Sequence, residues 1–229
     1  MQANPNAAII AALVSEASRA AILTVLLDGR FHSASELAHM ARIKPQTASF
    51  HLAKLVDANV VTVEKQGRHR YFAIRDQEVA RVMESLLSIA PPVTVKSLRQ
   101  SSQDKAMRYA RTCYDHLAGN VGVQLTNALL RNGILLEEED RYTVTERGER
   151  FFADFGVDLK QAATKRRLFS HQCLDWSERR HHLAGALGNA LLERVLELDW
   201  VRRLPGTRAV QVTSEGKAGF EEVFSLELN

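Results

Sequence analysis

The sequence contains only two cysteines and no apolar run that approaches the ~18 residues of a membrane span. Cys113 and Cys173 are too few for the disulfide framework of a small secreted protein, so each is either a small buried hydrophobe or a functional thiol. The segment from Met1 to Ala12 lacks the basic start of a signal peptide. We therefore expect a cytoplasmic protein without a membrane anchor.

Sequence motifs of enzymes are missing as well. The chain has no glycine-rich phosphate loop, no nucleophile elbow and no separated pair of acid and base. Pairs of cysteine and histidine support nucleophilic catalysis in some proteins, but no further catalytic group accompanies them here. The sequence therefore predicts that the protein is not an enzyme.

Basic and acidic residues nearly balance over the whole chain, but basic residues are in excess in one segment. The formal net charge is +3, from 30 basic and 27 acidic residues. Between Arg42 and Arg75, however, seven basic residues stand against two acidic ones, which gives a local net charge of +5. The rest of the chain is net negative, and this local basic segment indicates contact with nucleic acid.

Helical periodicity dominates the sequence, and we predict a mainly α-helical fold with small β-hairpins, an α+β protein. Apolar residues recur at helical spacing over residues 7–14 and 17–27. Ser33 and Glu36 have the spacing of a capping box, which starts a short helix that ends at Met40. Three helices are therefore expected before the basic segment.

A further helix is predicted over residues 45–58. Pro45 stands where the first residue of a helix belongs, because its fixed φ suits that position and its missing N–H would have had no partner there. A short helix, a tight turn and a second helix with small polar residues at its start fit a DNA major groove.

A β-hairpin is predicted directly after this helix. Residues 60–64 and 70–74 are rich in β-branched and aromatic side chains, and Gln66-Gly67 marks the turn. The tip of the hairpin is basic and carries Arg68, His69 and Arg70. Such a tip can contact phosphate or lie in the minor groove, where the negative potential is strong.

These motifs resemble the winged helix of the ArsR family of repressors. The resemblance covers about residues 7–90 and is carried by Glu36-Leu-Ala38, Gln46-Thr-Ala-Ser-Phe-His-Leu52, Lys54-Leu55 and Gly67-Arg-His-Arg-Tyr71. It implies that residues 45–58 read bases, that residues 60–74 form the wing, and that flanking helices form a homodimer. A dimer of this kind binds a palindromic operator in double-stranded DNA.

From the resemblance we expect DNA contacts from the outward face of the predicted recognition helix and from the wing. The candidate DNA-binding residues are Lys44, Gln46, Thr47, Ser49, Phe50, His51, Lys54, Arg68 and Arg70. Phe50 stands where the family usually has a histidine, and His51 fits a buried packing role equally well. Winged helices also serve as protein-interaction modules without DNA contacts, and replacing Arg68 and Arg70 would distinguish the two functions.

A domain boundary is predicted after the winged helix. Residues 76–89 read as one more amphipathic helix, which Pro91-Pro92 ends. We therefore expect a DNA-binding and dimerisation domain over residues 1–90, a polar linker over residues 91–104 and a C-terminal sensor domain over residues 105–229.

The C-terminal part of the sequence repeats itself. His116-Leu-Ala-Gly119 recurs as His182-Leu-Ala-Gly185, and Val144-Thr145 recurs as Val212-Thr213. The repetition predicts two units, over about residues 105–168 and 169–229, each with a helix, a short hairpin and a helix. Such units can pack about a pseudo-two-fold axis, and their interface is a natural place for a pocket.

Both cysteines precede the repeated His-Leu-Ala-Gly element. A helix through the first stretch would put Cys113 and His116 on one face, and the repetition would bring Cys173 and His182 alongside. Two thiolates and two imidazoles suit one zinc ion, or another thiophilic divalent ion such as cadmium, per chain. The second choices as ligands are Asp115, Asp175 and His181, and either carboxylate can instead orient an imidazole.

Other roles for this cluster stay open. Tyr109, Tyr114 and Trp176 can stack on an organic effector, while the two cysteines can form a reversible disulfide or be inert core residues. The ArsR resemblance favours a metal, but the family's usual ligands, near residues 35–40 or along residues 76–89, have no counterpart here. We therefore predict a repressor that is released from DNA by an effector bound in the C-terminal domain.

Overall fold

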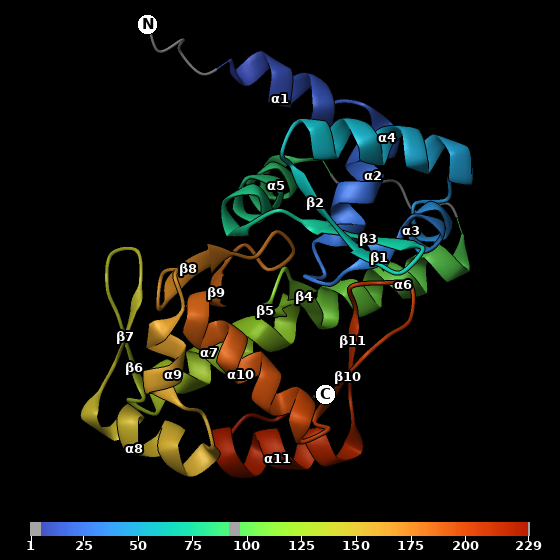
Figure 1. The fold of residues 1–229 in the computed structure, drawn as a ribbon. Coiled ribbons are helices and arrows are strands. Elements are labelled where there is room, and N and C mark those ends of the chain that lie inside the picture. The colour runs from blue at the N-terminus through green and yellow to red at the C-terminus, as the bar shows by residue number, and fades with distance from the viewer. Residues whose placement is uncertain (1–5, 92–96, 229) are drawn as a thin grey trace, which may run out of the picture. The chain divides into compact units, whose positions relative to one another are not determined.

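The computed structural model describes residues 6–91 and 97–228 and divides into two compact units, one that ends at Glu84 and one that begins at Ser85. The fold is mainly helical with small antiparallel hairpins, as predicted (Figure 1). Within the described residues no single helix is long and apolar enough to cross a membrane. The bent pair of helices over residues 7–14 and 17–26 passes that test together, by length and composition only.

The N-terminal unit is a winged helix-turn-helix. Its elements are α1 (Ala7–Val14), α2 (Ala17–Leu26), β1 (His32–Ser33), α3 (Ala34–Met40), α4 (Pro45–Asp57), β2 (Val61–Gln66) and β3 (His69–Ile74). Helix α5 (Gln77–Ile89) begins in this unit and ends in the next. Apolar side chains of α2, α3 and α4 form the core together with Phe72 and Ile74 of β3.

Local signals place α3 and α4 where the sequence predicts them. The Ser33 hydroxyl accepts a hydrogen bond from the backbone N–H of Glu36, and the Glu36 carboxylate accepts one from the backbone N–H of Ser33. Pro45 is the first residue of α4. The predicted helix-turn-helix is therefore confirmed, with its start signals intact.

The wing is the predicted hairpin of β2 and β3. The two strands pair antiparallel as far as Gln66 opposite His69, so Gly67 and Arg68 form a two-residue turn. Gly67 has a φ of +60°, in the left-handed region that a tight hairpin turn requires. The other edge of β3 pairs with β1, so the wing is attached to the segment that leads into α3.

The C-terminal unit contains the same order of elements twice. After α6 (Leu98–Tyr109), the first set is β4 (Arg111–Cys113), β5 (His116–Ala118), α7 (Gly119–Arg131), β6 (Leu135–Glu137), β7 (Tyr142–Val144) and α8 (Glu146–Phe155). After α9 (Leu159–Thr164), the second set is β8 (His171–Leu174), β9 (His181–Ala184), α10 (Gly185–Glu197), β10 (Val201–Arg203), β11 (Val210–Val212) and α11 (Ser214–Phe224). Each set has a helix, a hairpin and a helix in the predicted order, and one additional hairpin precedes them.

Glycines explain why the His-Leu-Ala-Gly sequence recurs. Gly119 and Gly185 are the first residues of α7 and α10, with φ of +77° and +85°, so a strand can turn directly into a helix. One turn later, a Cβ on Gly122 would lie 2.4 Å from the carbonyl oxygen of Leu117, and a Cβ on Gly188 would meet the equivalent oxygen of the second set. The repeated sequence therefore encodes a hairpin packed closely against the helix that follows it.

The helices of both sets share one apolar core. Its largest fully buried side chains include Leu129, Phe152, Phe220 and Phe224. Because both sets contribute to the same core, each buries the apolar face of the other.

The linker predicted over residues 91–104 is only partly tested, since residues 92–96, with Pro92, lie outside the described residues. Residues 98–104 are not a linker but the first part of α6. Ser97 caps this helix by accepting a hydrogen bond from the backbone N–H of Gln100, a start signal that the polar composition of the segment concealed.

Candidate nucleic-acid interface and candidate metal centre

Helix α4 presents a polar face to solvent. Its residues Ala48, Leu52 and Leu55 are buried at helical spacing, which turns the side chains between them outward. The predicted DNA-binding residues that are exposed are Lys44, Gln46, Ser49, Phe50, Lys54, Arg68 and Arg70, and Thr47 is half-buried. The exposed face thus combines cations and hydrogen-bonding groups.

A groove lies between α4 and the wing. It has a volume of about 530 Å³, and its lining includes Ser49 and Ala53 of α4, Ser35 of α3, and Arg68 and Arg70 of the wing. On the same helix the Lys54 ammonium lies 4.4 Å from the centre of the Phe50 ring, a cation–π contact. The polar face of the helix and the basic wing therefore border one hollow.

His51 does not belong to this face. Its side chain is 9 % exposed, and its Nε2 lies 3.4 Å from a carboxylate oxygen of Glu16. Its Nδ1 lies 3.4 Å from the guanidinium of Arg19. The groove-facing prediction for His51 is wrong, because its position on the helix places it beside Leu52 on the inner face, and the packing alternative describes the structure.

In the C-terminal unit, hairpins bring each cysteine to a histidine. Cys113 is directly opposite His116 across β4 and β5, and Cys173 is opposite His182 across β8 and β9. The predicted helix through the first pair is wrong, because Tyr114 adopts a left-handed φ of 58° and reverses the chain there. Residues directly opposite each other on a hairpin have neighbouring side chains. Each cysteine therefore lies beside the predicted histidine, although a hairpin and not a helix brings them together.

The four predicted ligands converge on one point. The Cys/His cluster consists of Cys113, His116, Cys173 and His182. One ligand atom of each residue lies within 4.8 Å of the ligand atoms of the other three. The two sulfur atoms are 3.7 Å apart and the two Nε2 atoms are 3.1 Å apart. Around a tetrahedral zinc ion, thiolates bound at about 2.3 Å lie about 3.8 Å apart, and imidazole nitrogens bound at about 2.0 Å lie about 3.3 Å apart. The cluster therefore fits one tetrahedral ion with two sulfur and two nitrogen ligands.

The cluster lies inside the protein and attracts positive charge. Cys113, His116 and His182 are buried and Cys173 is half-buried. Burial alone would lower the pKa of His116, but the charge of Cys113 and hydrogen bonds with Asp115 and Cys113 raise it to about 10. An ion that binds Nε2 of His116 would therefore have to displace a proton, so its binding should strengthen as the pH rises.

A carboxylate lies behind each imidazole of the cluster. An oxygen of Asp115 is 3.4 Å from Nδ1 of His116, and an oxygen of Asp175 is 3.4 Å from Nδ1 of His182. Since the Nε2 atoms face each other, both carboxylates are on the side of the ring away from the other imidazole. The positions of Asp115 and Asp175 fit the predicted role of orienting the imidazoles and do not fit the alternative role of metal ligands.

Two arginines that the sequence analysis missed hold these carboxylates. The fully buried Arg111 donates to Asp175 at 2.9 Å, and the backbone N–H of Gly119 donates to the same oxygen at 2.7 Å. Arg167 donates to Asp115. Burial alone would raise the pKa of Asp175, but His182 and Arg111 hold it well below its usual range. Neither arginine has a sequence signal, because its partner is more than 50 residues away and Arg167 lies in a basic run typical of a solvated surface.

His181 is not part of the cluster. It is exposed on β9, directly opposite Leu174, and successive side chains of a strand point to opposite faces. Because His182 points into the cluster, His181 points away from it, so this second choice as a ligand is wrong.

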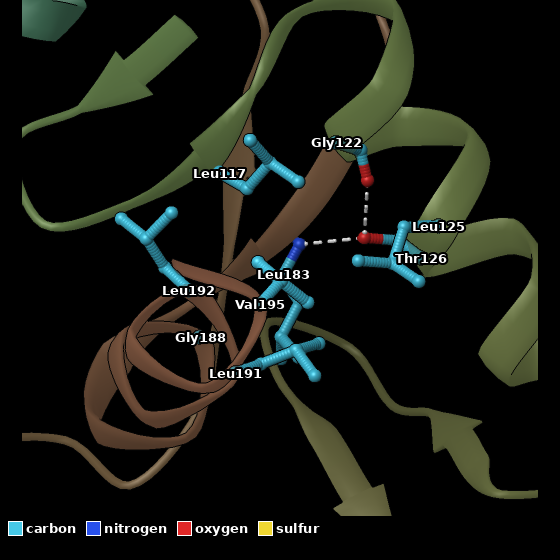
Figure 2. A pocket seen from close by; sticks show the side chains of 9 residues that line it. All are labelled: Leu117, Gly122, Leu125, Thr126, Leu183, Gly188, Leu191, Leu192 and Val195. Atoms are coloured by element: carbon cyan, nitrogen blue, oxygen red, sulfur yellow. Dashed lines mark hydrogen bonds between the residues drawn. The ribbon is translucent and has the colours of Figure 1, made fainter. Parts of the chain in front are cut away.

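One cavity between the two sets of elements, formed around α7 and α10, is too small for an organic effector. Figure 2 shows the cavity there, whose lining consists of Leu117, Gly122, Leu125, Thr126, Leu183, Gly188, Leu191, Leu192 and Val195. Thr126 closes it by donating to the carbonyl of Gly122 and accepting from the backbone N–H of Leu183, each at 2.9 Å. Its volume is about 10 Å³, room for about one water molecule.

Trp176, one of the three aromatic residues considered for stacking, has partners within the protein. The guanidinium of Arg111 lies 4.3 Å from the centre of the Trp176 ring, and that of Arg108 lies 5.4 Å from it. The Trp176 ring is therefore a platform for the arginine that holds Asp175.

Comparison with known proteins gives matches of two kinds. A family model described as a helix-turn-helix domain matches residues 14–64. The transcriptional regulator YdfF of Bacillus subtilis, described as HTH-type, is 52 % identical over 225 residues, which cover 98 % of this chain and 100 % of the relative.

Solved structures match the N-terminal part of the chain. The cadmium metal-sensor CMTR from Mycobacterium tuberculosis is 26 % identical, and the match covers 39 % of this chain and 93 % of that one with a TM-score of 0.33. A homodimeric winged helix-turn-helix DNA-binding domain from Mycobacterium bovis, described as a possible ArsR-family transcriptional regulator, is 23 % identical. That match covers 38 % of this chain and 84 % of the other with a TM-score of 0.33.

Proposed function

The chain belongs to the ArsR-type helix-turn-helix transcriptional regulators, and from this premise we propose a homodimeric repressor that binds a palindromic DNA operator and senses a thiophilic divalent metal ion. The winged helix binds DNA, and the Cys/His cluster of the C-terminal unit binds the ion. The observation that carries the proposal is the convergence of two sulfur and two nitrogen ligand atoms within 4.8 Å of one another.

The exposed face of α4 suits a major groove. Gln46 and Ser49 offer hydrogen bonds to base edges, while Lys54 and the wing residues Arg68 and Arg70 supply charge for the phosphate backbone. Phosphate contacts set the position of the helix and base contacts set the sequence preference. A dimer that places two such helices one helical turn apart would read a palindrome.

Apolar surface on two helices supports the homodimer. In α1, Ile9 and Ile10 are 59 % and 40 % exposed, and in α5, Val82 and Leu86 are 53 % and 39 % exposed. Large aliphatic side chains that are exposed to water favour burial by a partner, and Val82 and Leu86 lie on one face of α5 at i, i+4. A second copy of the same chain would bury these side chains.

Zinc or a related thiophilic ion would be held by Cys113, His116, Cys173 and His182, and when bound it would link two hairpins that are distant in the sequence. Four protein ligands leave no open coordination position, which is typical of structural and sensing sites rather than catalytic ones. Burial keeps solvent from Cys113 and from both imidazoles, and the carboxylates of Asp115 and Asp175 lie behind the two rings.

Arg111 connects the cluster to helix α6. Its guanidinium holds Asp175, which lies behind His182, and also donates to the carbonyl oxygen of Met107 in α6 at 3.1 Å. A movement of His182 would therefore be transmitted through Asp175 and Arg111 to α6. Allosteric couplings of about 1–3 kcal/mol change affinity about 5–150-fold, which is the loss of operator affinity that we expect on ion binding.

The metal is tested by elemental analysis of protein purified without chelator. We expect about one zinc or similar ion per chain, and none in the Cys113→Ser, Cys173→Ser double variant. The matched control is His181→Ala, which removes a histidine outside the cluster and should keep the ion. An ion that remains in the double variant, or no ion in either protein after reconstitution under reducing conditions, would contradict the metal site and favour an organic effector.

DNA recognition is tested separately by selection from random-sequence duplexes at fixed salt. We expect enrichment of a palindrome and a 5–150-fold weaker affinity for it when the ion is added, a change absent from the double variant. No sequence preference in the ion-free protein would contradict the repressor. Equal affinity with and without the ion would contradict sensing while leaving DNA binding intact.

A further inference from the structure

The two thiols of the Cys/His cluster lie close enough to react with each other. Their sulfur atoms are 3.7 Å apart, the two residues are not joined by a disulfide in this structure, and the sequence contains no other cysteine. We infer that Cys113 and Cys173 form a reversible intrachain disulfide when a hydroperoxide reaches the C-terminal unit, and that this disulfide and the bound ion exclude each other. The second half of this inference rests on the proposed metal site, and the first half does not.

A modest movement suffices to form the bond. Disulfide sulfurs are about 2.05 Å apart, so the two sulfurs must approach by about 1.7 Å, which side-chain rotation and a small shift of one hairpin can supply. The hairpins that carry them are neighbours, since β5 and β9 lie against each other. No unfolding of the unit is needed.

The two cysteines have different access to solvent, which assigns them different steps. Cys173 is half-buried, whereas Cys113 is 2 % exposed. Oxidants in water react with the accessible thiol first, and a second thiol nearby then resolves the product. Cys173 is therefore the thiol that meets the oxidant, and Cys113 is the thiol that completes the disulfide.

The chemistry balances with one hydroperoxide per disulfide. The Cys173 thiolate attacks one peroxide oxygen, the O–O bond breaks, and a sulfenic acid and one molecule of water (or alcohol) form once the leaving oxygen takes up a proton. Cys113 sulfur then attacks the Cys173 sulfur, the S–O bond breaks, and the hydroxide leaves as water with the proton of Cys113. Two sulfurs have lost one electron each, and the peroxide has gained both.

Oxidation removes two of the four ligands of the proposed ion. A disulfide sulfur has no thiolate charge, and thiolates are the form of cysteine that binds zinc. Conversely, an ion bound by both sulfurs occupies their lone pairs and keeps them about 3.8 Å apart, too far for a bond. The same four residues thus have an ion-bound reduced state and an ion-free oxidised state.

The experiment treats full-length, reduced, metal-free protein with one equivalent of hydrogen peroxide and counts thiols before and after. We expect free thiols to fall from two to none, a mass decrease of 2 Da in a chain that stays free of intermolecular disulfides, and recovery of both thiols with dithiothreitol. In Cys113→Ser, a sulfenic acid on Cys173 should be captured by dimedone. Two remaining free thiols, or disulfides formed only between chains, would overturn the inference.

The same treatment of zinc-loaded protein tests mutual exclusion, with a chromogenic chelator to measure released zinc. We expect about one zinc ion released per disulfide formed, and slower oxidation than in the metal-free protein. Zinc retained after full oxidation would overturn the exclusion. A protein that forms the disulfide but never binds zinc would contradict the proposed metal site and leave the redox pair standing, so the two failures are distinguishable.

Discussion

The two candidate sites of this protein differ most in their exposure to solvent. On α4 and the wing, the side chains expected to meet DNA are exposed, with the exceptions of Thr47 and His51. In the Cys/His cluster, three of the four side chains are buried and belong to the packing of the C-terminal unit. A phosphate backbone can be reached only by exposed groups, whereas a single ion can be held within the core. Substitutions should therefore separate function from stability in the first site and change both in the second.

The same contrast recurs between the two halves of the cluster. The pair Arg111 and Asp175 has no exposed side-chain surface, whereas the side chains of Arg167 and Asp115 are 15 % and 19 % exposed. Both carboxylates stand behind an imidazole at the same distance. The two halves thus place a carboxylate at the same distance from an imidazole, but they differ in burial and so in their expected contribution to stability.

The largest effect is expected from Asp175→Asn. The substitution leaves the guanidinium of Arg111 buried without its negative partner, and such losses cost about 3–5 kcal/mol. The matched Asp115→Asn should cost less, about 1–3 kcal/mol, since the side chains of that pair are partly exposed. Urea unfolding of the metal-free proteins measures both. Equal losses would show that burial does not distinguish the two halves.

A buried charge in the N-terminal unit tests whether stability there depends on residues away from the DNA face. Asp28 accepts hydrogen bonds from His32 at 2.8 Å and from the Arg30 guanidinium at 2.8 Å. Asp28→Asn should lower the free energy of unfolding by about 1.5–3 kcal/mol, the range for hydrogen bonds to a charged group. The exposed Asp57→Asn is the control and should change it by less than about 0.5 kcal/mol.

The same variant should also change the acid sensitivity of the unit. Burial alone would raise the pKa of Asp28, but His32 and Arg30 hold it below its ordinary value. A carboxylate with a lowered pKa stabilises the fold above about pH 4, and this contribution is lost as the pH falls through the lowered value. Asp28→Asn should therefore flatten the decline in stability below about pH 4. An unchanged pH profile would mean that Asp28 does not set it.

The fold of the N-terminal unit could be predicted because its signals are local. The capping box of Ser33 and Glu36, the Pro45 start and the Gly67 turn each act within a few residues, and the elements begin and end within two residues of their predicted positions. His51 was ambiguous because its burial depends on Glu16 and Arg19, which are more than 30 residues away.

The sequence predicted which four residues form the candidate metal site, but not the hairpins that carry them or the arginine behind them. Repetition of the Cys and His positions identified Cys113, His116, Cys173 and His182 without any knowledge of the elements that carry them. The hairpin at Tyr114 was missed because the turn lacks glycine, proline or asparagine. Arg111 was missed because nothing in a sequence marks an arginine that will be buried by a contact with Asp175.

On the wing, a change of affinity without a change of stability is expected. Arg68→Ala with Arg70→Ala should weaken operator binding about 10–100-fold, and should reduce the slope of log affinity against log salt by about 1.8, because two phosphate contacts are lost. The free energy of unfolding should stay within about 0.5 kcal/mol, since both side chains are exposed. A large loss of stability would show that these arginines contribute to the folded structure and not only to DNA binding. Unchanged DNA affinity would favour the interaction-module alternative.

We expect Phe50→His to have the smallest effect on stability and the most specific effect on DNA recognition. The Phe50 side chain is 56 % exposed and contacts Lys54 through a cation–π pair worth about 0.5–1 kcal/mol at such sites, so stability should fall by no more than this. The preferred DNA sequence should change instead, because histidine offers hydrogen bonds where phenylalanine offers only apolar contact, for example with a thymine methyl group. Selection from random duplexes with both proteins at the same salt concentration measures the preference. Identical selected sequences would show that Phe50 faces the phosphate backbone rather than the bases, and would move base reading to Gln46 and Ser49.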